Sequence, residues 1–378
     1  MPSLSRSAVH PDLRQAWQAV GGFQSYASCP ARLLVLTSTV IRAKFGYLSA
    51  YLEAGMAPQH IPGLSIAVLR EGKLVLAQGY GLANVEWSAP ATPETVYPLA
   101  SVTKTFTAAA IMLLVEEGKL GLQDRVTTIL PDLPATWGNV TVWHLLTHTC
   151  GIKDLFNAPS SPGTTERTPE GCIRVVADLP LEFEPGDRWT YTNSGYLILG
   201  LILEKVSGKP YGDFLGERIF QPLEMTATVL HDPAQIVKNR ASGYVWKDEA
   251  LWNAPVVSSR GAAAAMGGLA STVMDVAKWE AALCEEKILR RSTLEQMWTP
   301  AKLNSGETKR YGLGWWVQSI SGERKRVWHG GRTHGFSTCL FRFVEDQVTV
   351  VVLCNLDQTG APDAMAEEAA SLYVSIPT

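Results

Sequence analysis

Apolar residues fall into two kinds of run along the chain, and the runs predict strands at both ends. The segment "GLSIAVLREGKLVLAQGYGLANV" contains two apolar stretches joined by Arg70-Glu71-Gly72-Lys73, which predicts a β-hairpin with strands near 64–70 and 73–79. The last third has similar runs in "YGLGWWVQSI", "KRVWHGG", "FSTCLFRFV" and "VTVVVLCNL", which predict three or four further strands. The segment "DAMAEEAASLYVS" predicts a closing helix.

The block between these strand groups, roughly 100–290, is predicted to be mainly helical. From Phe106 the run "FTAAAIMLLV" is apolar on every side, which favours a helix buried in the interior, and Gly118 is expected to end it. If both strand groups share one sheet, the fold is α/β (α+β), with an antiparallel sheet flanked by helices and an inserted helical lobe.

The predicted domains follow from this arrangement. Residues 45–100 and 291–378 form the sheet lobe, residues 101–290 the helical lobe, and residues 1–44 an N-terminal extension or helix. An active site is expected at the lobe boundary, because ligand sites favour such boundaries. The apolar run Leu33–Ile41 is too short to cross a membrane, which takes about 20 apolar residues, and predicts an amphipathic helix.

Composition narrows the class of protein. The 378 residues are 46% hydrophobic and 18% charged with a formal charge of -3, values that disfavour a nucleic-acid-binding protein. The six cysteines are scattered without metal-ligand spacing, which predicts reduced thiols and favours the cytoplasm over a periplasmic or secreted location. An export signal remains an open alternative.

A serine and a lysine stand three positions apart at the start of the buried helix. Ser101 and Lys104 would share one face of its first turn, where the positive end of the helix lies. A desolvated lysine loses its proton more easily than a free one, and a neutral amine can take the proton of a serine hydroxyl. The alternative is that Ser101 only caps the helix.

Two later motifs bear on this choice. Tyr191-Thr192-Asn193 precedes a second predicted helix, and His329-Gly330-Gly331 lies where one strand turns towards the next. Taken separately, Asn193 or Ser194 could be a helix cap and the glycines a turn.

Taken in order, S-x-x-K, Y-x-N and H-G-G resemble the signature of the serine β-lactamase and penicillin-binding-protein superfamily. The similar branch holds class C β-lactamases, D-alanyl-D-alanine carboxypeptidases, D-aminopeptidases and family VIII carboxylesterases. The resemblance covers roughly residues 45–357 and includes "YPLASVTKTFTA", "GKLGLQDRV", "VTVWHLLTHTCGI", "GGLASTVMDVAKW" and "YGLGWW".

The resemblance implies catalytic roles for three residues. Ser101 would be the nucleophile that forms an acyl-enzyme, and Lys104 would activate it. Tyr191 would relay protons between Ser101, the leaving group and the deacylating water, with its ionised form favoured by Lys104. No metal and no cofactor are expected.

The resemblance also implies substrate-binding groups. Asn193 would hold the amide or ester side of the substrate, and the backbone N–H groups of Ser101 and Arg332 would form an oxyanion hole. A side chain at Gly330 or Gly331 is expected to block the approach of the acyl group to the strand.

Departures from the β-lactamase pattern bear on the substrate. Where β-lactamases carry K-T-G, this chain has His329 in the place of the lysine, so the fixed positive charge of that lysine is missing. Arg332 or Arg326 could supply the charge instead. Gly330 replaces a hydroxyl residue, and Cys150 takes a position that is commonly serine. No glutamate-asparagine pair of the class A kind is found, so deacylation would depend on Tyr191.

The favoured function is therefore a serine hydrolase, a family VIII-type carboxylesterase for small or medium acyl esters with weak β-lactamase activity. D-aminopeptidase, carboxypeptidase or β-lactamase action is the alternative within this chemistry, and a non-catalytic penicillin-recognising or scaffold protein is the alternative outside it. A small-molecule ester or amide is the expected partner, and the oligomeric state is left open.

Other residues have structural explanations that compete with functional ones. His144 and His148 have the spacing of a zinc pair but lack the glutamate of a metalloprotease, which favours hydrogen bonding at a helix end. His334 either lines the cleft or shapes a turn. The tryptophan pairs Trp315-Trp316 and Trp246/Trp252 either pack in the core or line an aromatic pocket.

Overall fold

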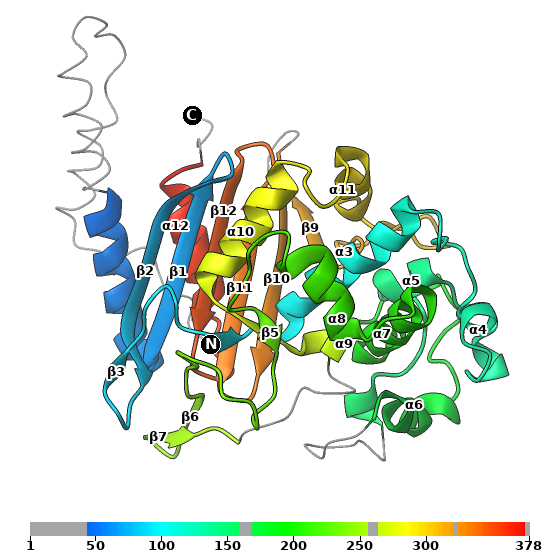
Figure 1. The fold of residues 1–378 in the computed structure, drawn as a ribbon, viewed down its shortest axis with the longest axis horizontal. Helices are drawn as coiled ribbons and strands as arrows, with labels where there is room; N and C mark the ends of the chain where they lie inside the picture. The colour runs from blue at the N-terminus through cyan, green and yellow to red at the C-terminus, as the bar shows by residue number, and fades with distance from the viewer. Residues whose placement is uncertain (1–43, 159–167, 256–263, 321–323, 375–378) are drawn as a thin grey trace, which may run out of the picture.

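A seven-stranded antiparallel sheet is the main feature of the computed structural model, which describes residues 44–158, 168–255, 264–320 and 324–374. The strand order is β3-β2-β1-β12-β11-β10-β9 (Figure 1). The strands are β1 (Gly63–Arg70), β2 (Lys73–Asn84), β3 (Ala89–Pro90), β9 (Trp316–Ser319), β10 (Lys325–Thr333), β11 (Phe336–Phe343) and β12 (Val348–Cys354).

The two predicted strand groups do share this sheet. They are joined by β1 and β12, which pair antiparallel from Leu64 opposite Cys354 to Arg70 opposite Val348. The predicted α/β fold with an antiparallel sheet is confirmed, as are the hairpin and the four C-terminal strands. The predicted helix over Leu33–Ile41 lies outside the described residues.

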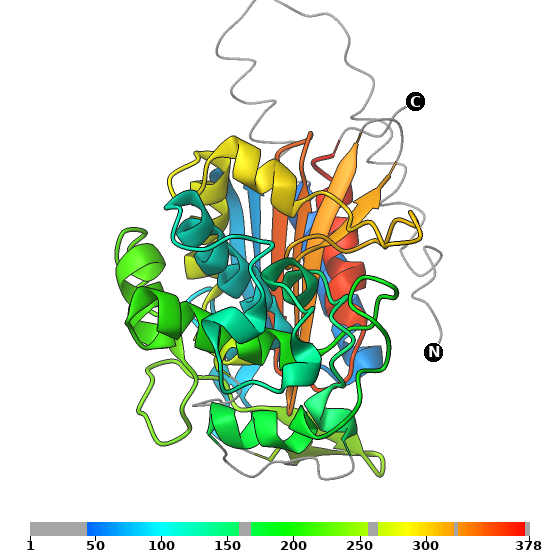
Figure 2. The ribbon, with the colours of Figure 1, turned by 90° about the vertical axis from the view of Figure 1, so that its right-hand side faces the viewer.

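Helices cover both faces of the sheet and form a second mass at one side, to the right in Figure 1. Figure 2 views the molecule from that helical side. The helices are α3 (Thr103–Glu116), α4 (Val126–Ile129), α5 (Val142–Leu146), α6 (Pro169–Ala177), α7 (Asn193–Ser207), α8 (Tyr211–Leu215), α9 (Ala264–Gly267), α10 (Val273–Cys284), α11 (Arg291–Met297) and α12 (Ala361–Ser371). Residues 44–56 are also helical.

Short elements connect these helices. One small sheet has the order β4 (Tyr97–Pro98), β8 (Leu269–Ser271), β5 (Val229–Leu230), and a separate hairpin consists of β6 (Tyr244–Lys247) and β7 (Ala250–Asn253). The 3-10 turn η3 (Ala100–Val102) links β4 to α3. No helix within the described ranges is long and apolar enough to cross a membrane.

The alternation of side chains along each strand divides the core between the two faces of the sheet. In β1, Ala67 and Leu69 join the cluster that also contains α3 and α7, whereas Leu64, Ile66 and Val68 join the cluster beneath α12 and the helix over 44–56. Both faces of β1 are therefore buried, which explains why its sequence is an almost continuous apolar run.

Helix α3 is the interior helix that its sequence predicts. Its residues from Thr103 to Leu114 are all buried, and it contacts α7, α9 and η3. Gly118, at φ +68°, follows its end. Helix α10 lies in the block predicted as the helical lobe, yet it packs on β1, β2 and β12. The domain limits at residues 100 and 290 stay a prediction.

Candidate active site

Ser101 occupies the middle of η3, immediately before α3. The N-cap position of α3 belongs to Val102, and no side chain caps the helix there, so the alternative that Ser101 is only a helix cap is wrong. Its Oγ instead lies 3.2 Å from the Nζ of Lys104. Ala100, just before it, has φ +47°, an uncommon backbone conformation for a residue with a side chain, at the turn from β4 into α3.

Lys104 is fully buried and its amine has three polar neighbours. Besides Ser101, the Nζ donates hydrogen bonds to Asn193 Oδ1 at 2.9 Å and to the carbonyl oxygen of Met266 at 2.5 Å. Burial lowers the pKa of Lys104 to about 7, although the nearby charge of Asp154 acts in the opposite direction. A substantial fraction of the amine is therefore neutral near pH 7.

Asn193 is held in place by a carboxylate that the sequence did not indicate. Asp154 Oδ2 accepts hydrogen bonds from the backbone N–H of Asn193 at 2.5 Å and from its side-chain Nδ2 at 3.0 Å. Because the amide nitrogen faces Asp154, the amide oxygen faces Lys104. The N-cap of α7 is Thr192, so the interpretation of Asn193 or Ser194 as a helix cap is wrong.

Tyr191 completes the group around the nucleophile. Its hydroxyl is hydrogen-bonded to the hydroxyl of Ser101, and the Nζ of Lys104 lies 5.0 Å from the centre of its ring. Burial raises the pKa of Tyr191 above its usual value, and the hydrogen bond to Ser101 only partly opposes this effect. The expectation that Lys104 favours an ionised Tyr191 is therefore not met: the phenol stays protonated.

Strand β10 brings the third motif against the nucleophile. A Cβ atom at Gly331 would lie 2.3 Å from the carbonyl oxygen of Leu99, 2.4 Å from Thr338 Oγ1 and 3.0 Å from the backbone nitrogen of Ser101. Only glycine fits there. At Gly330 the nearest atoms would be 3.7 and 3.8 Å away, an ordinary contact, so the packing of the protein itself requires glycine at 331 but not at 330. The expected effect of a side chain at either position on the approach of an acyl group stays a prediction.

Comparison with known proteins agrees with this geometry. The Beta-lactamase family profile matches residues 48–375. The chain belongs to the Beta-lactamase family. The predicted resemblance to the serine β-lactamase and penicillin-binding-protein superfamily is thereby confirmed, and the prediction of a serine hydrolase agrees with it.

Three relatives illustrate the range of this Beta-lactamase family. Penicillin-binding protein 4* of Bacillus subtilis (strain 168) is 30% identical over 76% of this chain and 66% of its own. The octameric penicillin-binding protein homologue from Pyrococcus abyssi is 33% identical, with a TM-score of 0.76 over 87% of this chain and 77% of its own. D-amino acid amidase from Ochrobactrum anthropi SV3 is 25% identical, with a TM-score of 0.74 over 86% of this chain and 98% of its own. The chain spans slightly less than two thirds of the length of Penicillin-binding protein 4*.

His329 shows how this member of the Beta-lactamase family differs from the K-T-G pattern. It is buried, its Nδ1 donates to the carbonyl oxygen of Gly330 at 2.7 Å, and its Nε2 accepts from the hydroxyl of Tyr311 at 3.0 Å. Burial and the nearby Lys104 lower its pKa to about 3, so it is neutral at ordinary pH. It supplies no cation to the site.

The two arginines proposed as substitutes differ in availability. Arg326 donates hydrogen bonds to Glu367 and to Gln318, and its guanidinium lies 4.8 Å from the ring centre of Trp328. Arg332 has an exposed side chain that lines the cavity in front of Ser101. Only Arg332 is therefore placed to meet a substrate.

The cavity in front of Ser101, here called the catalytic cavity, has a volume of about 400 Å³. Its walls come from η3, from the loop before α7, from strands β9, β10 and β11, and from the start of α12. The lining residues are Ser101, Tyr191, Trp316, Trp328, His329, Gly330, Gly331, Arg332, Ser337, Thr338, Thr359, Pro362 and Asp363. Trp315, by contrast, is a buried core residue.

The histidines at zinc spacing take part in separate hydrogen bonds. His144 Nδ1 accepts from the backbone N–H of Thr141 at 3.1 Å, which closes a capping box at the start of α5. His148 lies beyond α5, and its Nδ1 accepts from the backbone N–H of Thr192 at 3.2 Å. Its ring centre is 4.3 Å from that of Tyr191, so it packs against the candidate proton relay.

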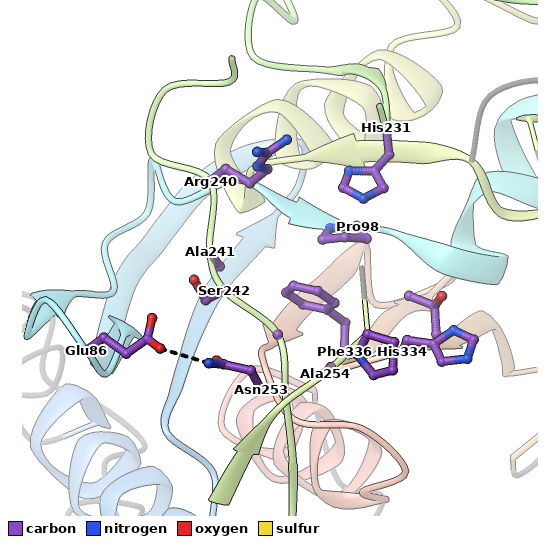
Figure 3. A pocket seen from close by; sticks show the side chains of 13 residues that line it. Glu86, Pro98, His231, Arg240, Ala241, Ser242, Asn253, Ala254, His334 and Phe336 are labelled. Atoms are coloured by element: carbon purple, nitrogen blue, oxygen red, sulfur yellow. Dashed lines mark hydrogen bonds between the residues drawn. The ribbon is translucent and has the colours of Figure 1, made fainter. Parts of the chain in front are cut away.

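A second cavity of about 370 Å³ is lined in part by residues at the β10–β11 turn (Figure 3). His334 lines this cavity rather than the catalytic one, together with His231, Arg240 and Phe336. At its other end Asn253 of β7 donates a hydrogen bond to Glu86 at 2.8 Å. Trp246 and Trp252, for which core packing or an aromatic pocket was expected, are instead exposed on the β6–β7 hairpin, where Trp246 stacks on His60.

Proposed function

We propose that this chain is an acyl hydrolase that works through a Ser101 acyl-enzyme, and that it acts as a carboxylesterase on small or medium acyl esters. The supporting observation is the fully buried Lys104, whose lowered pKa leaves a neutral amine 3.2 Å from the serine hydroxyl. No cofactor is needed for this chemistry, because every proton acceptor and donor comes from the chain.

Acylation begins at Ser101. A neutral lysine amine has two N–H donors and one lone pair; with the donors directed at Asn193 Oδ1 and at the Met266 carbonyl, the lone pair is left for the proton of Ser101. As the Ser101 oxygen attacks the substrate carbonyl, this proton passes to Lys104. The protonated Tyr191, hydrogen-bonded to Ser101, gives its own proton to the departing alcohol or amine and recovers one from Lys104.

The negative charge that develops on the carbonyl oxygen needs donors. We assign this role to the backbone N–H groups of Ser101 and Arg332. In support, Arg332 directly follows Gly331, whose Cβ position is 3.0 Å from the Ser101 nitrogen. Deacylation follows the same route: a water molecule replaces the leaving group and attacks the acyl-enzyme while it gives a proton to Tyr191, whose own phenol proton passes to the neutral Lys104. The acid then departs and Ser101 regains its proton.

The proposal favours esters over β-lactams because His329 is neutral. A β-lactam presents a carboxylate, and the residue in the position of the K-T-G lysine offers it no charge, which leaves the exposed Arg332 as the cation of the cavity lining. Amide hydrolysis of the kind named for the Ochrobactrum amidase is the second candidate, since that relative shares the fold at 25% identity. A non-catalytic scaffold is disfavoured, because it would have no need to bury an amine against a serine hydroxyl.

The experiment that tests the mechanism is the Ser101→Ala variant. Hydrolysis of p-nitrophenyl acetate and butyrate should fall to the uncatalysed rate while circular dichroism shows a folded protein. In the parent protein, a fluorophosphonate should add one adduct mapped to Ser101. An unchanged rate in the variant would refute the mechanism, and the absence of an adduct would favour the scaffold.

A side-by-side assay separates the substrate classes. A short ester, a chromogenic cephalosporin and a D-amino acid amide are compared by kcat/KM under the same conditions. We expect the ester to be hydrolysed fastest. A higher value for the amide would favour the amidase alternative without changing the assignment of Ser101.

A further inference from the structure

The catalytic cavity contains a carboxylate that the proposed mechanism does not use. Asp363, in the first turn of α12, lines the same cavity as Ser101 and Tyr191. A position near the N-terminus of a helix stabilises an ionised carboxylate but brings no cation to it. Among the described residues Asp363 forms no ion pair within 4.0 Å.

The immediate neighbours of Asp363 leave its carboxylate open towards strand β10. The thiol of Cys339 donates a hydrogen bond to it. Cys339 on β11 lies opposite Gly330 on β10. Asp363 Oδ1 is 3.8 Å from the position that a Cβ atom at residue 330 would occupy. Because residue 330 has no side chain, nothing at that position stands between the carboxylate and the cavity.

The basic residues near Asp363 do not neutralise it by contact. Arg326 is held by Glu367 and Gln318, and Arg332 acts on the carboxylate only as a nearby charge. Burial raises the pKa of Asp363 while both arginines lower it. Since His329 is neutral, Asp363 is the charged group within 4 Å of the Cβ position of residue 330, whereas the cation of Arg332 lines the same cavity farther from that position.

Aromatic faces stand in the same cavity. Trp316 and Trp328 line it, and their rings are stacked with centres 5.8 Å apart and planes 21° apart. The ring of Trp328 already has the guanidinium of Arg326 at 4.8 Å, so Trp316 is the ring available to a substrate cation. A carboxylate together with aromatic faces is the combination that binds organic ammonium groups, the first by charge and the second by cation–π attraction.

The position of Tyr191 indicates which part of a substrate occupies this region. Tyr191 lines the cavity, and it is the residue that would protonate the leaving group. We propose that Asp363, with Trp316, forms a subsite for a cationic leaving group, so that the preferred substrates are esters or thioesters of amino alcohols, amino thiols or their quaternary ammonium forms. This inference rests on the proposed hydrolase function.

Two thioesters that differ only in charge test the subsite. S-acetylthiocholine carries a trimethylammonium group, and S-(3,3-dimethylbutyl) thioacetate is its uncharged isostere. The thiol released from either substrate is measured with a chromogenic disulfide. The Ser101→Ala variant gives the background rate. We expect kcat/KM to be about 10-fold or more higher for the cationic thioester, the factor that corresponds to about 1.4 kcal/mol.

Variants assign the preference to Asp363. Asp363→Asn should bring the ratio of the two kcat/KM values to about 1, and Asp363→Glu should restore a ratio above 1. Glu368→Gln is the matched control: Glu368 lies on the same helix but accepts a hydrogen bond from Tyr47, at 2.6 Å, and its removal should leave the ratio as it is in the parent.

The outcomes separate the two proposals. Hydrolysis of both thioesters with a ratio near 1 in the parent protein, or a ratio that persists in Asp363→Asn, would overturn the subsite and leave the hydrolase mechanism standing. Failure to hydrolyse either thioester, together with the absence of a fluorophosphonate adduct on Ser101, would overturn both.

Discussion

At the scale of single residues, the site is organised around one desolvated amine. Lys104 is surrounded by groups that accept hydrogen bonds without neutralising it, Asn193 Oδ1 and the Met266 carbonyl, so its burial is not offset by a contacting carboxylate. Asp154 is near enough to oppose the lowering of its pKa but contacts Asn193 instead. The balance leaves the pKa close to neutrality, where a general base is most effective.

The first prediction is the pH dependence of acylation. The neutral form of Lys104 is the active base and its pKa is about 7, so kcat/KM for a neutral p-nitrophenyl ester should rise about tenfold per pH unit below pH 7 and level off above it. Tyr191 stays protonated because its pKa is raised, so no second rise is expected at high pH. A profile that rises only above pH 9 would instead indicate that ionised Tyr191 is the base.

The second prediction concerns the charge of Asp154. This carboxylate raises the pKa of Lys104, so Asp154→Asn should move the rising limb of the profile to lower pH. The same substitution removes an acceptor from Asn193 and should lower the plateau value of kcat/KM. Measuring the full profile separates the two effects; a lower plateau without a shift would mean that Asp154 acts only by positioning Asn193.

Sequence patterns located the reacting groups but not the residues that tune them. Ser101, Lys104, Tyr191 and Asn193 belong to motifs with fixed spacing, and the structure brings all four together. Asp154 lies 39 positions before Asn193 in a loop without a distinctive spacing, and Met266 contributes only a backbone oxygen. A backbone acceptor leaves no trace in side-chain identity, so it could not have been predicted.

At the scale of elements, the strands were predictable and their neighbours were not. Apolar runs with turn residues between them marked β1, β2 and β9–β12. The runs are most continuous in β1 and β12, because these strands are buried on both faces. The packing of α10 on the sheet was missed. An amphipathic helix carries an apolar face whether its partner is a sheet or another helix, so its sequence does not say which one it covers.

The third prediction concerns the contact between β10 and η3. Gly331→Ala places a methyl group 2.3 Å from the Leu99 carbonyl oxygen and 3.0 Å from the Ser101 nitrogen, so strand and turn must move apart. We expect a loss of about 1–3 kcal/mol in the free energy of unfolding and at least a 100-fold slower fluorophosphonate reaction, since the oxyanion donors separate.

Gly330→Ala is the matched control for stability. Its methyl group meets only ordinary contacts, so its free energy of unfolding in urea should stay within about 0.5 kcal/mol of the parent value. If Gly331→Ala were as stable and as reactive as the parent, the close approach of β10 to the nucleophile would not matter for the site.

At the scale of the whole molecule, the helical part and the sheet share one core. A single cluster of buried residues contains Phe106 of α3 and Leu199 of α7 together with Leu340 of β11 and Val351 of β12. The catalytic groups are divided in the same way, with Ser101 and Lys104 on the helical side and Gly331 on the sheet. A site built from both sides of one continuous core requires that both sides remain packed together.

The last prediction follows from this shared core. We expect urea to unfold the described fold in one transition, with coincident midpoints for far-ultraviolet circular dichroism, tryptophan fluorescence and ester hydrolysis. Fluorescence reports the shared core because Trp137, Trp279 and Trp315 are all buried in it. If the two lobes were instead independent units joined by a mobile boundary, activity would disappear at a lower urea concentration than the circular dichroism signal, and fluorescence would show two steps.

The Lys104→Met variant is the control that separates loss of the active site from loss of the fold. This variant lacks the base, so hydrolysis is lost without urea, but its two spectroscopic midpoints should still coincide with each other. Coincidence in both proteins would show that the boundary predicted at residues 100 and 290 divides the chain in sequence but not in cooperative folding.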